Sequence, residues 1–142
     1  MIRTYVDSCV LLDAWTGRKA LAQRALEILD DPGREYLSSI FVRLETVPLA
    51  SYHKNDLELA FYQAFFDSVT AWAMDLDAVV GLGEEAACRF GLSATDALHI
   101  AAASLLGADE FITTERADIP TSSCGSCKDH YSLYLSFDQL WN

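Results

Sequence analysis

The sequence has few of the residues that break or cross-link a chain, and it has no long apolar run. Only three prolines, seven glycines and four cysteines occur among its 142 residues. This composition excludes a collagen-like repeat, a flexible linker protein and a disulfide-dense secreted domain. No stretch reaches the roughly 18 uninterrupted apolar residues of a membrane span, and the first residues lack the apolar core of a signal peptide. We therefore expect a single cytoplasmic domain over residues 1–142, with no membrane partner.

Positive charge is also scarce. Ten lysines and arginines stand against 21 aspartates and glutamates, which gives a formal net charge of −11. A negative field repels phosphate backbones, so any nucleic-acid binding has to be local or assisted by metal ions. The same balance suits a cation-binding site or a basic protein partner. Hydrophobic residues make up 51% of the chain, which is enough for a core and too much for a disordered protein.

The apolar residues follow a pattern that predicts strands alternating with helices. Short runs of β-branched and aromatic residues predict strands, and apolar residues at helical spacing predict the helices between them. Strands separated by helices of this length pair in parallel through right-handed crossovers. We therefore expect a three-layer α/β/α sandwich with a mainly parallel central sheet. The expected strands are 2–6, 36–39, 69–73, 110–113 and 131–137, and the expected helices are 8–15, 18–29, 41–52, 57–66, 76–90 and 96–106.

Four acidic residues lie where the expected elements begin, end or turn inward. Asp7 follows the first strand, Glu115 follows the fourth, Asp96 opens the most apolar helix, and Glu45 lies among apolar neighbours on the third helix. Ligands of open parallel sheets bind at the carboxyl ends of the strands, so these acids can meet at one edge. Crowded carboxylates are costly unless cations neutralise them. Sites with only oxygen ligands select hard ions such as Mg²⁺ or Mn²⁺.

Each of these acids also has a purely structural explanation. Asp7 can cap the helix that follows it, and the segment from Ser93 to Asp96 fits a capping box. Glu45 can be a solvated helix residue, and Glu115 can be an ordinary loop charge. The structural explanation is favoured for each acid taken singly, and only their joint order favours a site.

Four short segments carry these acids in a recognisable order. They are Val6-Asp7-Ser8-Cys9-Val10-Leu11-Leu12, Arg43-Leu44-Glu45-Thr46-Val47, Leu92-Ser93-Ala94-Thr95-Asp96-Ala97-Leu98-His99-Ile100-Ala101-Ala102-Ala103 and Phe111-Ile112-Thr113-Thr114-Glu115. Their order resembles that of the PIN domain, the compact nuclease fold of the VapC-like toxins, over nearly the whole chain. The third segment, with its alanine-rich helix, is the most specific part of the resemblance.

The resemblance implies a metal-dependent endoribonuclease that hydrolyses RNA phosphodiester bonds with one or two Mg²⁺ or Mn²⁺ ions. Asp7 and Asp96 would be direct metal ligands, and Glu45 and Glu115 would bind directly or through water. These four acids are then also the candidate catalytic residues. The resemblance further implies the toxin of a toxin–antitoxin pair, which would be a homodimer covered by a basic antitoxin segment.

Two positions depart from the family pattern. Glu115 stands where the family commonly has Asp, so Asp118 is the alternative fourth acid, and Cys9 stands where Asn or Ser is frequent. These departures and the acidic surface also fit a catalytically inactive PIN-like binding or scaffold module. An unrelated α/β phosphotransfer domain is a further alternative, but no glycine-rich phosphate loop follows the first strand.

Several polar residues near the acids have two explanations. His99 follows Asp96 by three residues on the same helical face, which places it near the acids. We expect a core histidine with satisfied hydrogen bonds. Ser8, Thr113 and Thr114 can bind the acids or a phosphate, but capping of turns is favoured.

One motif lies outside the resemblance. Cys124, Cys127 and His130 could bind zinc or, in the case of the cysteines, form a disulfide. Three candidate ligands in one loop are a weak zinc signal, because structural zinc sites use four. A surface loop with incidental cysteines is the favoured interpretation.

Overall fold

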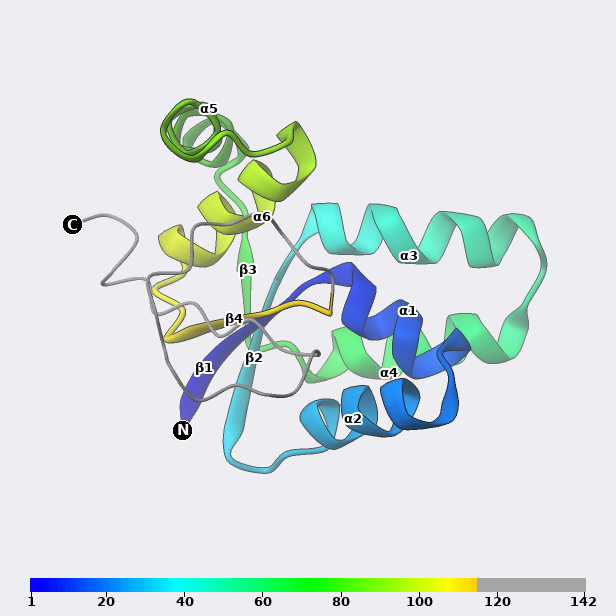
Figure 1. Ribbon diagram of the computed structural model, residues 1–142. Coiled ribbons are helices and arrows are strands. Elements are labelled where there is room, and N and C mark those ends of the chain that lie inside the picture. Colours follow the sequence, from blue (N-terminus) through cyan, green and yellow to red (C-terminus); the bar gives the residue numbers. More distant parts are fainter. Residues whose placement is uncertain (115–142) are drawn as a thin grey trace.

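The computed structural model describes residues 1–114, which form a parallel sheet flanked by helices (Figure 1). Every strand pair is parallel, and the spatial order of the strands is β3-β2-β1-β4. The α/β sandwich expected from the sequence is therefore confirmed. The strand expected at 131–137 lies outside the described residues. The strands are β1 (Ile2–Val6), β2 (Arg34–Ser39), β3 (Ala71–Ala73) and β4 (Glu110–Ile112).

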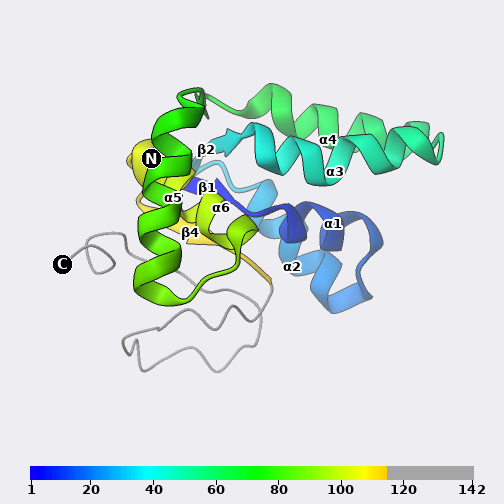
Figure 2. The ribbon, with the colours of Figure 1, turned by 90° about the horizontal axis from the view of Figure 1, so that it is seen from above.

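The helices lie on both sides of this sheet. Helices α5 and α6 lie to the left in Figure 1, and the other helices lie to the right. Viewed from above, α3 and α4 run side by side and project away from the strands (Figure 2). None of the described helices is both long and apolar enough to cross a membrane. The helices are α1 (Ser8–Thr16), α2 (Lys19–Leu29), α3 (Ile40–Tyr52), α4 (Asp56–Ser68), α5 (Leu76–Phe90) and α6 (Ala94–Leu105).

Local capping interactions fix where the helices nearest the sheet edge begin and end. The Asp7 carboxylate caps α1 by accepting the N–H of Ser8, and the Ser93 hydroxyl caps α6 by accepting the N–H of Asp96. Gly91 ends α5 in the left-handed region at φ 66°, which favours glycine. The cap expected from Asp7 is therefore confirmed, and of the capping box expected from Ser93 to Asp96 the structure shows the half in which Ser93 accepts the Asp96 N–H. These caps also place two acidic residues at helix starts, on the same side of the sheet.

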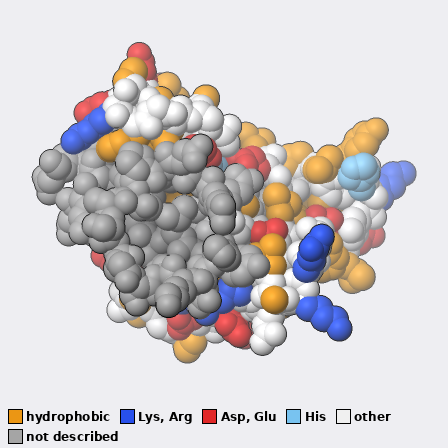
Figure 3. Space-filling model, in the orientation of Figure 1, with side chains coloured by type: hydrophobic (Ala, Val, Ile, Leu, Met, Phe, Trp, Pro, Cys, Tyr) orange, Lys and Arg blue, Asp and Glu red, His pale blue; other side chains and the backbone are white. Residues whose placement is uncertain are grey.

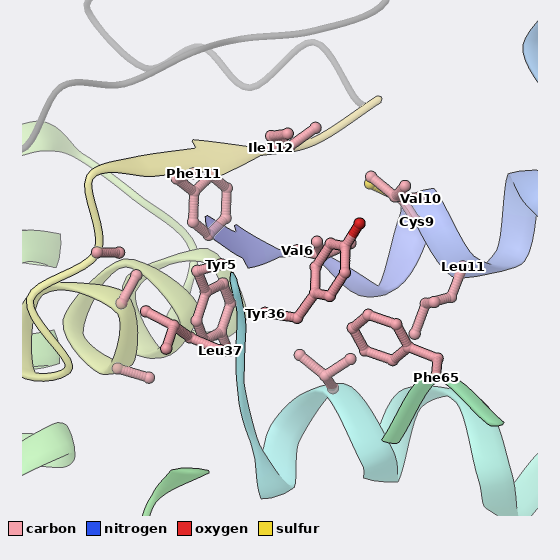
Figure 4. Close-up of a cluster of buried hydrophobic side chains, with 14 of the residues drawn as sticks. Tyr5, Val6, Cys9, Val10, Leu11, Tyr36, Leu37, Phe65, Phe111 and Ile112 are labelled. Carbon is pink, nitrogen blue, oxygen red and sulfur yellow. The ribbon is translucent and has the colours of Figure 1, made fainter. Parts of the chain in front are cut away.

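The core is built around the central strand β1. Tyr5, Leu37 and Ile112, from three neighbouring strands, are fully buried. The ring of Tyr5 stacks on that of Phe111 with centroids 5.5 Å apart (Figure 4). Helix α6 packs against β2 and β3, and its small side chains at 101–103 are buried all around the helix. Because alanine methyl groups take little room, this helix carries its polar residues close to the end of β1.

A largely buried ion pair links three neighbouring strands near the amino ends of β2 and β4. Glu110 of β4 accepts a hydrogen bond of 2.6 Å from the Thr4 hydroxyl of β1 and one of 2.8 Å from Arg34 Nε of β2. Arg34 also pairs with Asp31, in the turn before β2. Burial of these charges is tolerable because each has an opposite charge or a hydrogen-bond donor beside it.

Removal of a central core side chain should destabilise this sheet. Leu37 is fully buried, so Leu37→Ala leaves a cavity and should lower the free energy of unfolding by about 2–5 kcal/mol. Urea denaturation with circular dichroism measures the loss. Val80→Ala is the control, because Val80 is 54% exposed on α5, and it should change stability by less than about 0.5 kcal/mol. Equal losses in the two variants would contradict the described core.

Candidate active site

A cleft of about 240 Å³ opens at the carboxyl edge of the sheet. Three of the acids expected from the sequence, Asp7, Glu45 and Asp96, line it from α1, α3 and α6. The structure thus brings together side chains that are up to 89 positions apart in the sequence. Among residues 1–114, the lining is Asp7, Ser8, Cys9, Glu45, Ser93, Thr95, Asp96 and His99.

The remaining expected site residues cannot be placed in this cleft. They lie outside the described residues and comprise the expected fourth acid Glu115, its alternative Asp118, and the motif of Cys124, Cys127 and His130. The described part of the chain ends at Thr114, just after β4. Thr113, which precedes it, already contacts the cleft acid Asp7. The carboxyl end of β4 is therefore at the cleft, where the sequence analysis expected it.

Asp7 is held rigidly from both sides of its carboxylate. Its Oδ1 accepts the N–H of Ser8 at 2.7 Å, and its Oδ2 accepts the hydroxyl of Thr113 at 3.0 Å. The Asp7 backbone N–H continues the sheet by bonding the carbonyl of Ile112 at 2.9 Å. Ser8 and Thr113 therefore do more than cap turns, because they orient this acid. With only 7% of Asp7 exposed, the carboxylate has a fixed direction into the cleft.

Glu45 is bonded to its surroundings although its side chain is 36% exposed. Its Oε2 accepts the Ser8 hydroxyl at 2.7 Å, and its Oε1 lies 2.5 Å from His99 Nε2. Partial burial opposes the charged form, but hydrogen bonds from His99 and Ser8 lower the pKa of Glu45 below its ordinary value. The purely solvated helix residue considered from the sequence is thus not what the structure shows. Glu45 is an ionised cleft residue.

His99 lies beneath the acids and is only 1% exposed. Besides Glu45, its Nε2 lies 3.7 Å from Asp7 Oδ1. On the other side of the ring, Nδ1 lies 2.9 Å from the Tyr5 hydroxyl. Burial opposes protonation, but the Glu45 hydrogen bond and the charges of Asp7, Glu45 and Asp96 together raise the pKa of His99. The expected core histidine with satisfied hydrogen bonds is present, and it also faces the cleft.

Asp96 reaches the cleft from the first turn of α6. Its backbone N–H donates to the Ser93 hydroxyl at 3.3 Å, which is one half of the expected capping box. Its side chain lies on the same helical face as His99, one turn away, and its charge acts on that ring. Asp96 can therefore take part in both, because its backbone N–H is in the helix cap and its carboxylate lines the cleft.

Cys9, which departs from the family pattern, is buried between α1 and β4. Its Sγ lies 3.0 Å from the Thr113 hydroxyl and accepts the N–H of Thr114 at 3.2 Å. Burial, with a further effect from the Asp7 charge, raises the pKa of the Cys9 thiol to about 11. Because a protonated thiol is a poor nucleophile, Cys9 joins two elements and does not act as an attacking group.

The geometry fits a divalent cation. One ligand atom each from Asp7, Glu45 and His99 can be chosen so that all three lie within 4.8 Å of one another. Such ions bind their ligands at about 2.0–2.6 Å, so atoms separated by up to roughly twice that distance can share one ion. Asp96 adds a further carboxylate on the same cleft. The donor set is mostly oxygen with one imidazole nitrogen.

Tyr5 is the part of this site that the sequence analysis missed. Its hydroxyl bonds both His99 and Ser39, the latter at 2.6 Å, although its ring belongs to the core. A signal for it exists in the sequence, because residues two apart on a strand share a face. Tyr5 precedes Asp7 by two, so an acid expected at the strand end places the tyrosine beside it.

The pair of Glu45 and His99 should make stability depend on pH when chelator removes all metal. The raised pKa of His99 gives stability that is complete below its ordinary value of 6.5 and is lost as the pH rises through the folded value. The lowered pKa of Glu45 gives stability that is complete above its ordinary value of 4.5 and is lost as the pH falls through the folded value. The advantage of the native protein over Glu45→Gln should therefore be largest between about pH 4.5 and 6.5.

Urea denaturation of both proteins across this pH range, in chelator, measures the difference. Glu84→Gln on the exposed side of α5 is the matched control and should show no such maximum. A difference between native protein and Glu45→Gln that stays constant with pH would show that the two side chains are not coupled.

Comparison with known proteins agrees with this geometry. The family model described as "PIN domain" matches residues 4–117. A chain of a toxin–antitoxin complex from Klebsiella pneumoniae is 20% identical, with a TM-score of 0.62 over 84% of this chain and 92% of that one.

A second solved structure gives the same result. A chain of VapBC2 from Rickettsia felis, bound to a DNA fragment from their promoter, is 12% identical, with a TM-score of 0.59 over 84% of this chain and 94% of that one. No curated protein matches significantly. At these identities the two structures show a shared fold. Because the family model spans most of the sequence, the chain belongs to the PIN domain family.

Proposed function

We propose that this chain is a metal-dependent endoribonuclease that hydrolyses RNA phosphodiester bonds, and that it is the toxin of a type II toxin–antitoxin pair in the cytoplasm. The observation that carries the proposal is the meeting of Asp7, Glu45 and Asp96 in one cleft at the carboxyl edge of a PIN-domain sheet. PIN domains are generally nucleases, and both similar structures come from toxin–antitoxin complexes. The fourth acid of the proposed site is Glu115 or Asp118.

The described residues can hold a cation and fix its surroundings. Asp7, Glu45 and Asp96 would provide the ligand oxygens for Mg²⁺ or Mn²⁺. When bound, such an ion lowers the pKa of water and offsets negative charge on a reacting phosphate. Ser8 donates to Glu45 and to Asp7, so one residue sets the relative orientation of two acids from different helices. Because Cys9 is a neutral thiol, nothing in the described cleft favours a covalent thiol mechanism.

The proposed partners follow from charge and exposed apolar surface. A net charge of −11 disfavours RNA over most of the surface and suits a basic antitoxin segment. Apolar side chains gather over the projecting end of the α3 and α4 pair in Figure 3. Leu49 and Tyr52 of α3 and Leu57 of α4 are 61%, 80% and 75% exposed. Exposed apolar groups of this kind support a protein interface, and we include a homodimer in the proposal.

The first test removes one charge from the cleft. Asn at position 96 keeps the backbone cap of α6 but cannot supply the negative oxygen that a divalent cation requires. Loss of even an outer partner of a metal ligand costs about 10–100-fold, so Asp96→Asn should lower the cleavage rate of a mixed RNA in Mn²⁺ by more than about 100-fold.

Asp77→Asn is the matched control for this test. Asp77 lies in the first turn of α5, so the substitution changes the same charge at the same kind of helix position. Its cleavage rate should equal that of the native protein, and circular dichroism should show both variants folded. Equal rates in native protein and Asp96→Asn would remove Asp96 from the active site. Absence of cleavage by the native protein would favour the inactive binding module.

The second test asks whether a cation binds the folded chain. A ligand that binds only the native state adds about 2.7 kcal/mol at a concentration of 100 times its Kd. Mn²⁺ should therefore raise the melting temperature of the native protein, and should raise that of Asp96→Asn much less. An unchanged melting temperature of the native protein across millimolar Mn²⁺ would contradict the metal site.

A further inference from the structure

The imidazole of His99 is directed into the cleft from below. Its Nε2 lies 2.5 Å from Glu45 Oε1 and 3.7 Å from Asp7 Oδ1, so it faces both acids at once. The residue is 1% exposed, which means that the ring has no freedom to turn toward solvent. An oxygen-only site, as expected from the sequence, does not describe this arrangement.

The opposite side of the ring is anchored by a buried chain of hydroxyl groups. His99 Nδ1 lies 2.9 Å from the Tyr5 hydroxyl, which lies 2.6 Å from Ser39 Oγ. Tyr5 and Ser39 are both fully buried. In the chain without a cation, Nε2–H donates to Glu45, Nδ1–H donates to the Tyr5 hydroxyl, and that hydroxyl donates to Ser39. A cation that replaces the Nε2 proton meets the Nε2 lone pair, while Nδ1–H keeps its partner. Histidines that bind metals have this arrangement, in which the second ring nitrogen donates to a fixed partner and sets the tautomer.

We propose that His99 Nε2 is a direct ligand of the cleft cation, beside Asp7 and Glu45, and that the site therefore prefers a transition-metal ion such as Mn²⁺ or Co²⁺ to Mg²⁺. The proposal rests on the proposed metal-dependent function. The ion would replace the proton that Nε2 shares with Glu45, and one ligand atom each from Asp7, Glu45 and His99 already lies within 4.8 Å of the others. Imidazole nitrogen suits transition-metal ions, whereas Mg²⁺ favours carboxylate, carbonyl and water oxygens.

A spectroscopic measurement tests the ligand directly. Electron spin echo modulation of the full-length protein loaded with Mn²⁺ detects a directly bound ¹⁴N nucleus. The native protein should show imidazole nitrogen coupling, and His99→Gln should lose it. The chain has two other histidines. His53→Gln, at the exposed end of α3, and His130→Gln, outside the described residues, are the controls and should both keep the coupling.

Affinity measurements test the consequence for metal preference. Calorimetric titration gives the Kd of the protein for Mn²⁺ and for Mg²⁺. The Kd for Mg²⁺ divided by the Kd for Mn²⁺ should fall by about tenfold in His99→Gln. Tyr5→Phe keeps the buried ring and removes only the hydroxyl that anchors Nδ1. As the loss of an outer partner, it should weaken Mn²⁺ binding by about 10–100-fold. Thermal unfolding in chelator verifies that each variant is folded.

The outcomes separate this inference from the proposed function. Mn²⁺ bound to the native protein without nitrogen coupling, or with coupling that survives in His99→Gln, overturns the ligand role and leaves the metal-dependent nuclease standing. Failure of the native protein to bind Mn²⁺ overturns both. If His99→Gln does not fold, two other results support the inference. They are a loss of Mn²⁺ affinity in Tyr5→Phe, and nitrogen coupling that is present in the native protein and in both control variants. Unchanged Mn²⁺ affinity in Tyr5→Phe overturns the anchoring of Nδ1.

Discussion

The arrangement of the cleft depends on how the repulsion between the carboxylates of Asp7 and Glu45 is offset. Asp7 and Glu45 come from different helices, and their negative charges would push these helices apart if nothing lay between them. The structure opposes this repulsion with hydroxyl donors from Ser8 and Thr113 and with the His99 imidazole. The sheet, the caps and helix α6 can be understood as the framework that keeps these groups in place.

Helix α6 shows how packing and chemistry depend on each other. Its buried alanines allow the helix to approach the strands closely, and that approach places His99 against Tyr5 of the central strand. A larger side chain at 101–103 would force the helix outward. The ring of His99 would then lose Tyr5 and the two acids together. The alanine-rich pattern that identifies the family in the sequence therefore has a physical basis in the site.

The sequence was sufficient for the architecture and for most of the cleft, for reasons that particular residues illustrate. The sequence pattern predicted the described strands and helices because the buried residues of elements such as β1 and α6 are close together in the chain. Asp7 and Asp96 were identifiable because each directly follows or opens an element. The link from Ser39 through Tyr5 to His99 was not predictable in the same way, since it joins three elements and depends on the register of β1 against β2. The hydrogen bond of the Cys9 thiol was likewise not predictable, because its partner Thr113 is 104 positions away in the sequence.

The position of Glu45 along α3 has a mechanical consequence. A helix rises about 1.5 Å per residue, so the backbone of Glu45 lies about 10 Å along the axis of α3 from that of Tyr52, at the exposed end of the helix. Asp7, by contrast, is anchored to the sheet through Ile112 and Thr113. Val42 and Ala50 of α3 are buried in the core, so a tilt imposed on the projecting end of this helix would change the gap between the two acids and move core side chains with it. The exposed end of α3 and one side of the cleft therefore belong to the same helix.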